Sequence, residues 1–180
     1  MRKVVGYLLM TVDGVIEEPA DWLENFDDDL RQNMMDVINA QDAVLLGRGM
    51  YQEWARYWPS ANEEHAFASF INPVHKYVVS TTLSDVDQWQ PATLIRGDVA
   101  QAITELKQQP GKNIGVHGSI TLFRWLLEQN LVDELELAVF PVLAGGGKRR
   151  LYDGDGLKRL KLVSSRATRS GALILSYQLA

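Results

Sequence analysis

Two buried-strand patterns in this chain each end in a glycine and continue directly into a helical pattern. The first is Ala43–Leu46 followed by Gly47-Arg48-Gly49, and the second is Ile114–His117 followed by Gly118-Ser119-Ile120. Glycine at such a turn lets a ligand approach the backbone, and a helix start offers unpaired N–H groups to an anion. The same pattern also fits ordinary tight turns, with Ser119 as a helix cap. Two such junctions, one of them carrying an arginine, predict a phosphate-bearing cofactor held at both ends.

Strand and helix patterns alternate along most of the chain. Strands are expected at residues 4–10, 43–46, 76–80, 93–96, 113–117 and 135–142, and helices at 28–39, 49–57, 99–107 and 119–129. This alternation requires right-handed crossovers and a mostly parallel twisted sheet with helices on both faces. Two final segments, 160–167 and 172–179, alternate in the half-buried manner and predict a C-terminal antiparallel hairpin. We therefore expect one three-layer α/β domain over residues 1–180, with ligands at the carboxyl ends of the strands.

Composition excludes several classes of protein. The apolar share of 46% fills a core for one domain. The net charge of −5 argues against a nucleic-acid binder that recognises only the charged backbone. No apolar run approaches the roughly 20 residues that span a bilayer, and the first residues are typical of a strand rather than a signal peptide. With no cysteines and three scattered histidines, we expect a cytoplasmic protein without disulfides or a metal site.

Two charged segments each allow a functional and a structural interpretation. The run 145–150, Gly-Gly-Gly-Lys-Arg-Arg, is not a P-loop, because Val142 replaces the first glycine and Arg149 follows the lysine. It is either a flexible connection with a solvated basic cluster or a site for an anionic group on a substrate. Asp29, the last of three aspartates at a helix start, either stabilises that start or serves as the acid beside a hydride acceptor.

Five segments together resemble one known family. They are Thr-Val-Asp-Gly-Val-Ile (11–16), Leu-Leu-Gly-Arg-Gly-Met-Tyr-Gln-Glu-Trp (45–54), Lys-Tyr-Val-Val-Ser (76–80), Val-His-Gly-Ser-Ile (116–120) and the stretch 131–147 from Leu-Val-Asp-Glu-Leu-Glu-Leu to Pro-Val-Leu-Ala-Gly-Gly-Gly. The family is the dihydrofolate-reductase-like group, which includes the reductase domain of the bifunctional riboflavin-biosynthesis deaminase-reductase. The resemblance covers nearly the whole chain, in order.

This resemblance implies an NADPH-dependent reductase. The first junction would hold cofactor phosphate, the second would hold the pyrophosphate, and Arg48 with Arg96 would select the 2′-phosphate. Backbone near Leu9 and Ile16 would flank the nicotinamide. The full set of cofactor residues implied by the resemblance is Leu9, Ile16, Gly47, Arg48, Gly49, Met50, Ser80, Thr81, Arg96, His117, Gly118, Ser119 and Ile120.

The chain departs from the family pattern at three places. Met50 stands where the family usually has threonine, and His117 replaces the first glycine of the usual pair. Residues 57–75 contain no arginine to clamp a folate tail. The expected substrate is a pterin-like compound or an aminopyrimidine.

We expect this small-molecule substrate between the first strand and the helix 28–39. The expected contacts are Asp29 as the catalytic acid, Trp22, Met34 and Trp54 as walls, and Lys148 and Arg149 as anchors for a substrate phosphate. The family resemblance also implies a homodimer. Two alternatives stay open: a reductase of an unrelated small molecule, and a nucleotide-binding sensor or partner-binding domain without catalysis.

Overall fold

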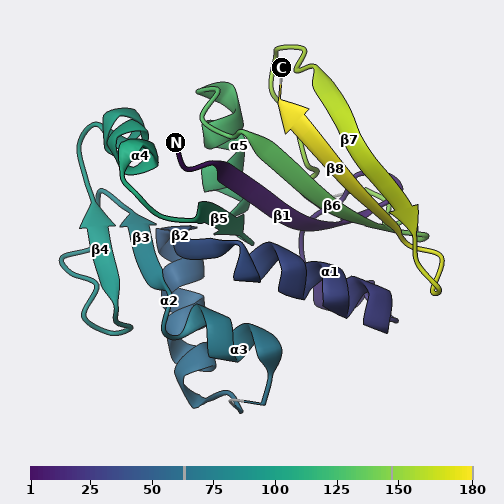
Figure 1. The fold of residues 1–180 in the computed structure, drawn as a ribbon, viewed down its shortest axis with the longest axis horizontal. Coiled ribbons are helices and arrows are strands. Elements are labelled where there is room, and N and C mark those ends of the chain that lie inside the picture. The colour runs from purple at the N-terminus through teal and green to yellow at the C-terminus, as the bar shows by residue number, and fades with distance from the viewer. Residues whose placement is uncertain (63, 147, 180) are drawn as a thin grey trace.

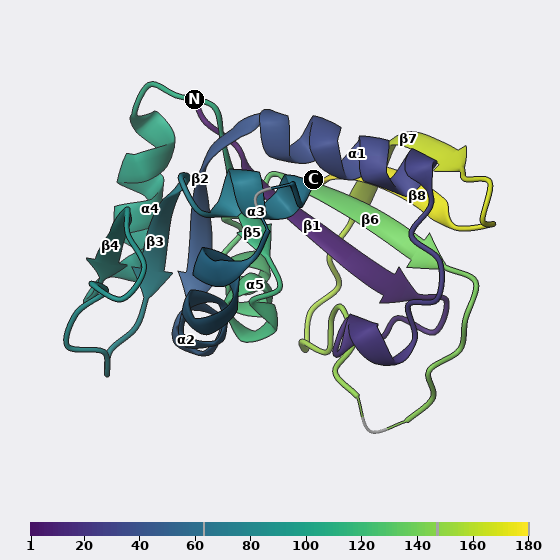
Figure 2. The ribbon, with the colours of Figure 1, turned by 90° about the horizontal axis from the view of Figure 1, so that it is seen from below.

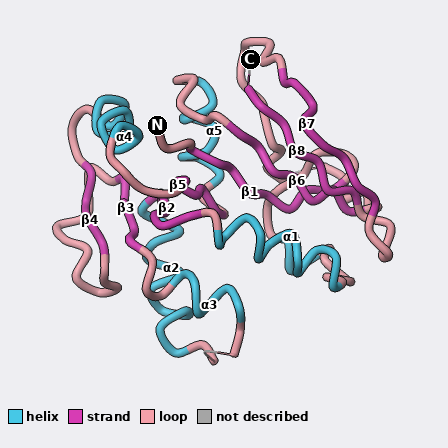
Figure 3. Tube along the Cα trace, viewed as in Figure 1, coloured by secondary structure: helices cyan, strands magenta, loops and turns pink. Residues whose placement is uncertain are grey.

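A single eight-stranded sheet organises the chain. The computed structural model describes residues 1–62, 64–146 and 148–179. The strand order across the sheet is β4-β3-β2-β5-β1-β6-β8-β7, which Figures 1 and 3 show as one continuous twisted surface. The strands are β1 (Val4–Thr11), β2 (Gln41–Gly47), β3 (His75–Val79), β4 (Ala92–Ile95), β5 (Asn113–His117), β6 (Glu134–Phe140), β7 (Leu160–Ala167) and β8 (Leu173–Leu179).

Helices cover both faces of this sheet. They are α1 (Asp28–Asn39), α2 (Arg48–Tyr57), α3 (Ala66–Ile71), α4 (Val99–Gln108) and α5 (Ile120–Glu128), with 3-10 turns at Pro19–Asp21 and Trp58–Ser60. Helices α4 and α5 bury their apolar side chains with one face of the central strands. Helices α1, α2 and α3 pack on the opposite face, as the view in Figure 2 shows. The predicted three-layer α/β architecture is confirmed.

The six strands from β1 to β6 are parallel to one another, and crossovers connect them. Strand β8 pairs antiparallel with β6 and with β7, which confirms the predicted C-terminal hairpin. The expectation that both hairpin strands are half-buried was wrong for β7, since all eight of its residues are exposed. The physical reason is its position: β7 is the edge of the sheet.

The helix starts differ in how they are capped. The Asp27 carboxylate accepts a hydrogen bond of 2.9 Å from the Leu30 N–H at the start of α1, and Asp98 does the same for Gln101 in α4. These bonds satisfy N–H groups that lack partners within a helix. Helices α2 and α5 have no side-chain cap. No side chain therefore occupies the start of either helix, although the first N–H group of α5, that of Ile120, donates to the Gly118 carbonyl oxygen at 3.0 Å.

A lysine lies inside the apolar cluster under α2 and α3. Lys76 is fully buried, and its Nζ donates to the carbonyl oxygens of Asn72 at 2.7 Å and Val74 at 2.9 Å. The same atom lies 4.4 Å from the centre of the Trp89 ring, a cation–π contact. Burial lowers the pKa of Lys76 to about 8 from the ordinary 10.5, because a charge in an apolar setting loses its hydration.

Within the described residues, no helix has both the length and the apolar character that crossing a membrane requires.

We predict that Lys76 makes stability depend on alkaline pH. Between pH 8 and 10.5 the unfolded chain holds this proton and the folded chain does not, so the unfolding free energy rises with pH in that window. Lys76→Met removes the titrating group. Urea unfolding at several pH values gives the free energy of unfolding of both proteins. The value for the variant minus the value for wild type should fall as the pH rises from 8 to 10. A difference that stays constant with pH contradicts the prediction.

Candidate functional site

The two strand–glycine–helix junctions lie side by side. Strands β2 and β5 are parallel neighbours, with Leu45 opposite Val116, so both strands end at the same edge of the sheet. The Gly47 N–H donates a hydrogen bond of 3.0 Å to Ser119 Oγ. One bond therefore joins turns that are 72 residues apart in the sequence.

This bond also determines how the two helices begin. Ser119 directs its hydroxyl to Gly47 and does not cap α5 with it, and Gly47, the residue before α2, has no side chain to offer. The first turns of α2 and α5 thus meet at one place without a side-chain acceptor. Each helix start carries a partial positive charge of roughly half an elementary charge, so the pair favours an anion.

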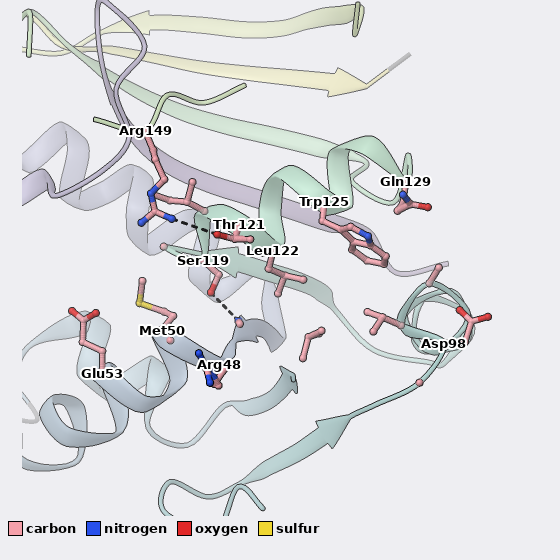
Figure 4. A pocket seen from close by; sticks show the side chains of 18 residues that line it. Arg48, Met50, Glu53, Asp98, Ser119, Thr121, Leu122, Trp125, Gln129 and Arg149 are labelled. Atoms are coloured by element: carbon pink, nitrogen blue, oxygen red, sulfur yellow. Dashed lines mark hydrogen bonds between the residues drawn. The ribbon is translucent and has the colours of Figure 1, made fainter. Parts of the chain in front are cut away.

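A cleft of about 950 Å³ opens beside these helix starts. Figure 4 shows α2 on one side of the cleft, α5 on the other, and the start of α4 at the far end. The residues that line it are Gly47, Arg48, Gly49, Met50, Glu53, Val79, Gly97, Asp98, Val99, Ala100, Gly118, Ser119, Ile120, Thr121, Leu122, Trp125, Gln129 and Arg149.

Gly118 takes a conformation that favours glycine. Its φ angle is +67°, in the left-handed region. A Cβ atom placed there would lie 2.9 Å from Met50 Cε and 3.3 Å from Trp54 Cζ2. Both the backbone geometry and the neighbouring side chains therefore require the smallest residue at this turn.

His117, the residue before this glycine, turns away from the cleft. Its side chain is 3% exposed, and Nε2 donates to Gln41 Oε1 at 2.7 Å. Burial lowers the pKa of His117 to about 4, so the ring is neutral at pH 7. The family position usually held by glycine is here occupied by a neutral side chain packed beneath the sheet.

Two arginines lie along the cleft. Arg48 is exposed, and its Nη1 donates to Thr82 Oγ1 at 3.1 Å. Among the residues that the structure describes, no carboxylate pairs with Arg48, so its charge remains available. Arg149 donates from Nε to Glu17 Oε1 at 2.7 Å and from Nη1 to Thr121 Oγ1 at 3.4 Å. An anion in the cleft would meet one uncompensated guanidinium and one already shared with a carboxylate.

The loop that carries Arg149 is held by the first loop of the chain. The Asp13 carboxylate accepts a hydrogen bond from the Thr11 hydroxyl at 2.6 Å and one from the Gly145 N–H at 2.9 Å. These bonds, with one from a neighbouring N–H, lower the pKa of Asp13 to about 2. With the Arg149–Glu17 ion pair, they fix the rim of the cleft to the end of β1.

Eight of the residues predicted from the sequence line the cleft: Gly47, Arg48, Gly49, Met50, Gly118, Ser119, Ile120 and Arg149. The predicted cofactor residues that do not line it are Leu9, Ile16, Ser80, Thr81, Arg96 and His117. Ser80 Oγ instead accepts hydrogen bonds of 3.1 Å from the N–H groups of Thr82 and Leu83. Arg96 donates to the carbonyl oxygens of Leu83 and Ser84. Both side chains thus shape the loop whose Thr82 contacts Arg48.

The structure places Asp29 outside the cleft, at the C-terminal hairpin. Its carboxylate accepts hydrogen bonds from the backbone N–H of Arg169 at 3.1 Å and from Arg169 Nε at 3.2 Å. These contacts lower the pKa of Asp29, which keeps it ionised. An ionised carboxylate bound to an arginine is poorly suited to donate a proton, so this placement does not favour the predicted acid role.

The other predicted substrate residues have structural partners too. Trp22 is buried, with its ring centre 5.7 Å from that of Phe140, and Trp54 packs edge-on against Phe67 at 5.6 Å. Lys148 forms ion pairs with Glu18, at 2.8 Å, and with Asp21. Met34 packs against the cluster under α2 and α3. None of these four residues lines the cleft.

The sequence interpretation missed a third strand–glycine–helix junction, at which Asp98 caps the helix. Gly97, with φ +74°, follows β4 and precedes α4, so the pattern that identified Gly47 and Gly118 was also present here. It also missed the cleft face of α5, where Thr121, Leu122, Trp125 and Gln129 recur at helical spacing. Within the described residues, no group of three histidine, cysteine or acidic side chains is placed to hold a metal ion.

A family model and a curated relative each match nearly the whole chain. The model of the RibD C-terminal domain matches residues 2–174. The uncharacterized protein YyaP of Bacillus subtilis is 31% identical over 182 residues, which cover 98% of this chain and 94% of that protein.

Two solved structures share the fold at low sequence identity. The Thermotoga maritima diaminohydroxyphosphoribosylaminopyrimidine deaminase/5-amino-6-(5-phosphoribosylamino)uracil reductase has a TM-score of 0.69 at 15% identity, over 99% of this chain and 57% of that one. Dihydrofolate reductase from Enterococcus faecalis, complexed with NADP(H), has a TM-score of 0.63 at 12% identity, over 98% and 96% of the two chains. The fold is thus dihydrofolate-reductase-like, and the chain belongs to the RibD C-terminal domain family.

Proposed function

We propose that this chain is an NADPH-dependent reductase that transfers hydride to a small heterocycle, either pterin-like or an aminopyrimidine. The observation that carries the proposal is the joint start of α2 and α5: two helices without side-chain caps, linked by the Gly47–Ser119 bond, open into one cleft. Membership of the RibD C-terminal domain family supports a reductase of the riboflavin-pathway type.

The cleft residues suit a dinucleotide with an additional phosphate. The N–H groups in the first turns of α2 and α5 would bind the diphosphate, and Gly118 would let it approach the backbone. The unpaired Arg48 charge would bind the 2′-phosphate. Val99, Leu122 and Trp125 supply an apolar wall for a flat base. When bound, NADPH supplies the hydride; the residues of the chain hold and orient it.

The substrate class is supported by the neighbours of this chain. The Thermotoga maritima protein is named as a reductase of an aminopyrimidine, and the Enterococcus faecalis protein as a dihydrofolate reductase. We assign Asp29 to holding the C-terminal hairpin against α1, because Arg169 occupies its carboxylate. Lys148 likewise holds its own loop, since two carboxylates share its charge.

One observation favours a second candidate, a nucleotide sensor without catalysis. Asp29, the residue expected to serve as the acid, binds Arg169 and does not line the cleft. The cleft thus has the groups that would bind a nucleotide without the expected proton donor. A protein that binds NADPH but reduces neither pterins nor aminopyrimidines in a steady-state absorbance assay would favour this candidate.

We predict that Arg48 distinguishes NADPH from NADH. Arg48→Ala should weaken NADPH binding about 10- to 100-fold, as expected for hydrogen bonds to a charged group, and leave NADH binding nearly unchanged. Fluorescence titration of both nucleotides measures this. Arg31→Ala, which removes an exposed arginine from α1, is the matched control and should affect neither. Equal losses for the two nucleotides after Arg48→Ala would rule out the assigned role.

Gly118→Ala should instead weaken both nucleotides to the same extent. The diphosphate is common to them, and an alanine in the left-handed region costs about 1–2 kcal/mol of stability. Thermal unfolding gives the stability and the same titration gives the affinities. Gly146→Ala, where an added Cβ has open space, serves as the control. If Gly118→Ala folds and binds NADPH as wild type does, the second junction does not hold the cofactor.

The exposed edge strand supports a further proposal, that the chain forms a homodimer. Leu160, Leu162 and Val163 on β7 are 39%, 51% and 57% exposed, and Leu157 before the strand and Leu173 at the start of β8 are 80% and 44% exposed. Strand β7 also has backbone N–H and C=O groups along the free edge of the sheet. Both features are typical of a surface that a second chain covers.

We predict that Leu162→Glu shifts this dimer to monomer. A charge introduced on each copy would place two carboxylates at the same interface, which opposes association. Light scattering after size-exclusion chromatography reports the mass. Leu143→Glu, at a site 73% exposed and outside the hairpin, should leave the mass unchanged. A monomeric wild-type protein at high concentration would contradict the proposal.

A further inference from the structure

Arg149 lines the cleft from the long connection between β6 and β7, and the chain that follows β1 holds its backbone. The Ile16 N–H donates to the Arg149 carbonyl oxygen at 3.1 Å. Beside this bond, Val15 and Arg150 form an antiparallel bridge. Val15 and Ile16 are both buried, so this support is part of the core. The position of Arg149 at the cleft is therefore fixed by contacts within the chain.

Glu17, which does not line the cleft, holds Arg149 at two atoms. Its Oε2 accepts a hydrogen bond from the Arg149 backbone N–H at 2.9 Å, and its Oε1 accepts one from Arg149 Nε at 2.7 Å. The bond from the backbone, followed by that from the side chain, lowers the pKa of Glu17, so the carboxylate is ionised at pH 7. Because Glu17 binds the guanidinium only at Nε, the two terminal nitrogens remain for other partners.

These terminal nitrogens lie beside the first turn of α5. Nη1 donates to Thr121 Oγ1 over 3.4 Å, and Nη2 has no hydrogen-bond partner among the residues that the structure describes. Figure 4 shows the guanidinium reaching toward Thr121. A neutral hydroxyl at this distance is a weak acceptor, and a charged phosphate oxygen would replace it readily. An anion at the start of α5 would thus contact a forked, permanently charged donor as well as the positive end of the helix.

We propose that Arg149 binds the diphosphate of the dinucleotide and that Glu17 positions it for this contact. The inference rests on the proposed function, which assigns the diphosphate to the first turns of α2 and α5. A guanidinium that is already held at Nε loses little conformational freedom when its terminal nitrogens bind a phosphate. Arg48 and Arg149 would then bind different phosphates of one nucleotide. This role differs from the sequence-based expectation that Arg149 anchors a substrate phosphate.

Titration of the full chain with NADPH and, separately, with adenosine 2′-monophosphate tests the contact. The second nucleotide has the 2′-phosphate but no diphosphate. Arg149→Ala should weaken NADPH binding about tenfold or more, as expected for lost hydrogen bonds to a charged group, and leave adenosine 2′-monophosphate binding unchanged. A general change in the fold would weaken both nucleotides alike. No substrate is present, so a lost contact to a substrate phosphate cannot produce the result.

Glu17→Gln tests the positioning role, because an amide has one acceptor atom where the carboxylate has two. It should weaken NADPH binding about threefold, in the range of an exposed ion pair. In the Arg149→Ala background it should cause no further loss, since Glu17 acts through Arg149. Glu18→Gln is the matched control: it removes the same charge from a residue that pairs with Lys148, and it should leave both affinities unchanged.

The outcomes separate this inference from the proposed function. If NADPH binds and Arg149→Ala leaves its affinity unchanged, or weakens both nucleotides equally, the inference is overturned and the proposed function stands. Unchanged or tighter NADPH binding after Glu17→Gln, or a further loss in the double variant, overturns the positioning role of Glu17. A wild-type chain that does not bind NADPH overturns the proposed function and this inference together.

Discussion

The hydrogen bond from the Gly47 N–H to Ser119 Oγ holds together the part of the molecule on which the candidate site depends. It fixes the end of β2 to the start of α5, and it uses the one side chain that would otherwise cap α5. Because glycine precedes α2, that helix also starts without a side-chain cap. The consequence is electrostatic: two helix starts, neither of them capped by a side chain, meet at one cleft.

Two helix starts and two arginines gather at the carboxyl edge of the parallel sheet, and the topology explains part of this placement. Crossover helices follow the strands, so their starts gather at the carboxyl edge together with Arg48 and Arg149. The opposite edge carries charges of both signs, among them the ion pairs Lys3–Glu134 and Lys107–Asp133. An anionic cofactor at the carboxyl edge would meet the charge that suits it.

Local patterns in the sequence were enough to predict the order and type of the main elements. The strand–glycine–helix junctions were recognised because their signal lies within a few adjacent residues, and parallel pairing of β2 with β5 then brings them together. The segment around Gly97 has the same strand–glycine–helix pattern, and the sequence interpretation did not identify it. By contrast, the partner of Asp29 is Arg169, 140 residues away. No local pattern indicates such a contact.

Local sequence patterns also could not predict that the edge strand β7 is exposed. The alternation in 160–167 is the same whether a strand is central or at the edge, and only the strand order of the whole sheet shows that β7 has one neighbour. His117 is a similar case: the sequence shows that a glycine is replaced, whereas its bond to Gln41 depends on the space at Gly115, where a Cβ would lie 2.1 Å from Gln41 Oε1 and 2.6 Å from His117 Nε2.

The central claim is that both uncapped helix starts hold a single dinucleotide. A crystal structure of the chain soaked with NADPH tests it most directly. We expect continuous density for one nucleotide, with diphosphate oxygens within hydrogen-bonding distance of backbone N–H groups in the first turns of both α2 and α5. A nucleotide that contacts only one of these helix starts, or that binds elsewhere, would contradict the claim.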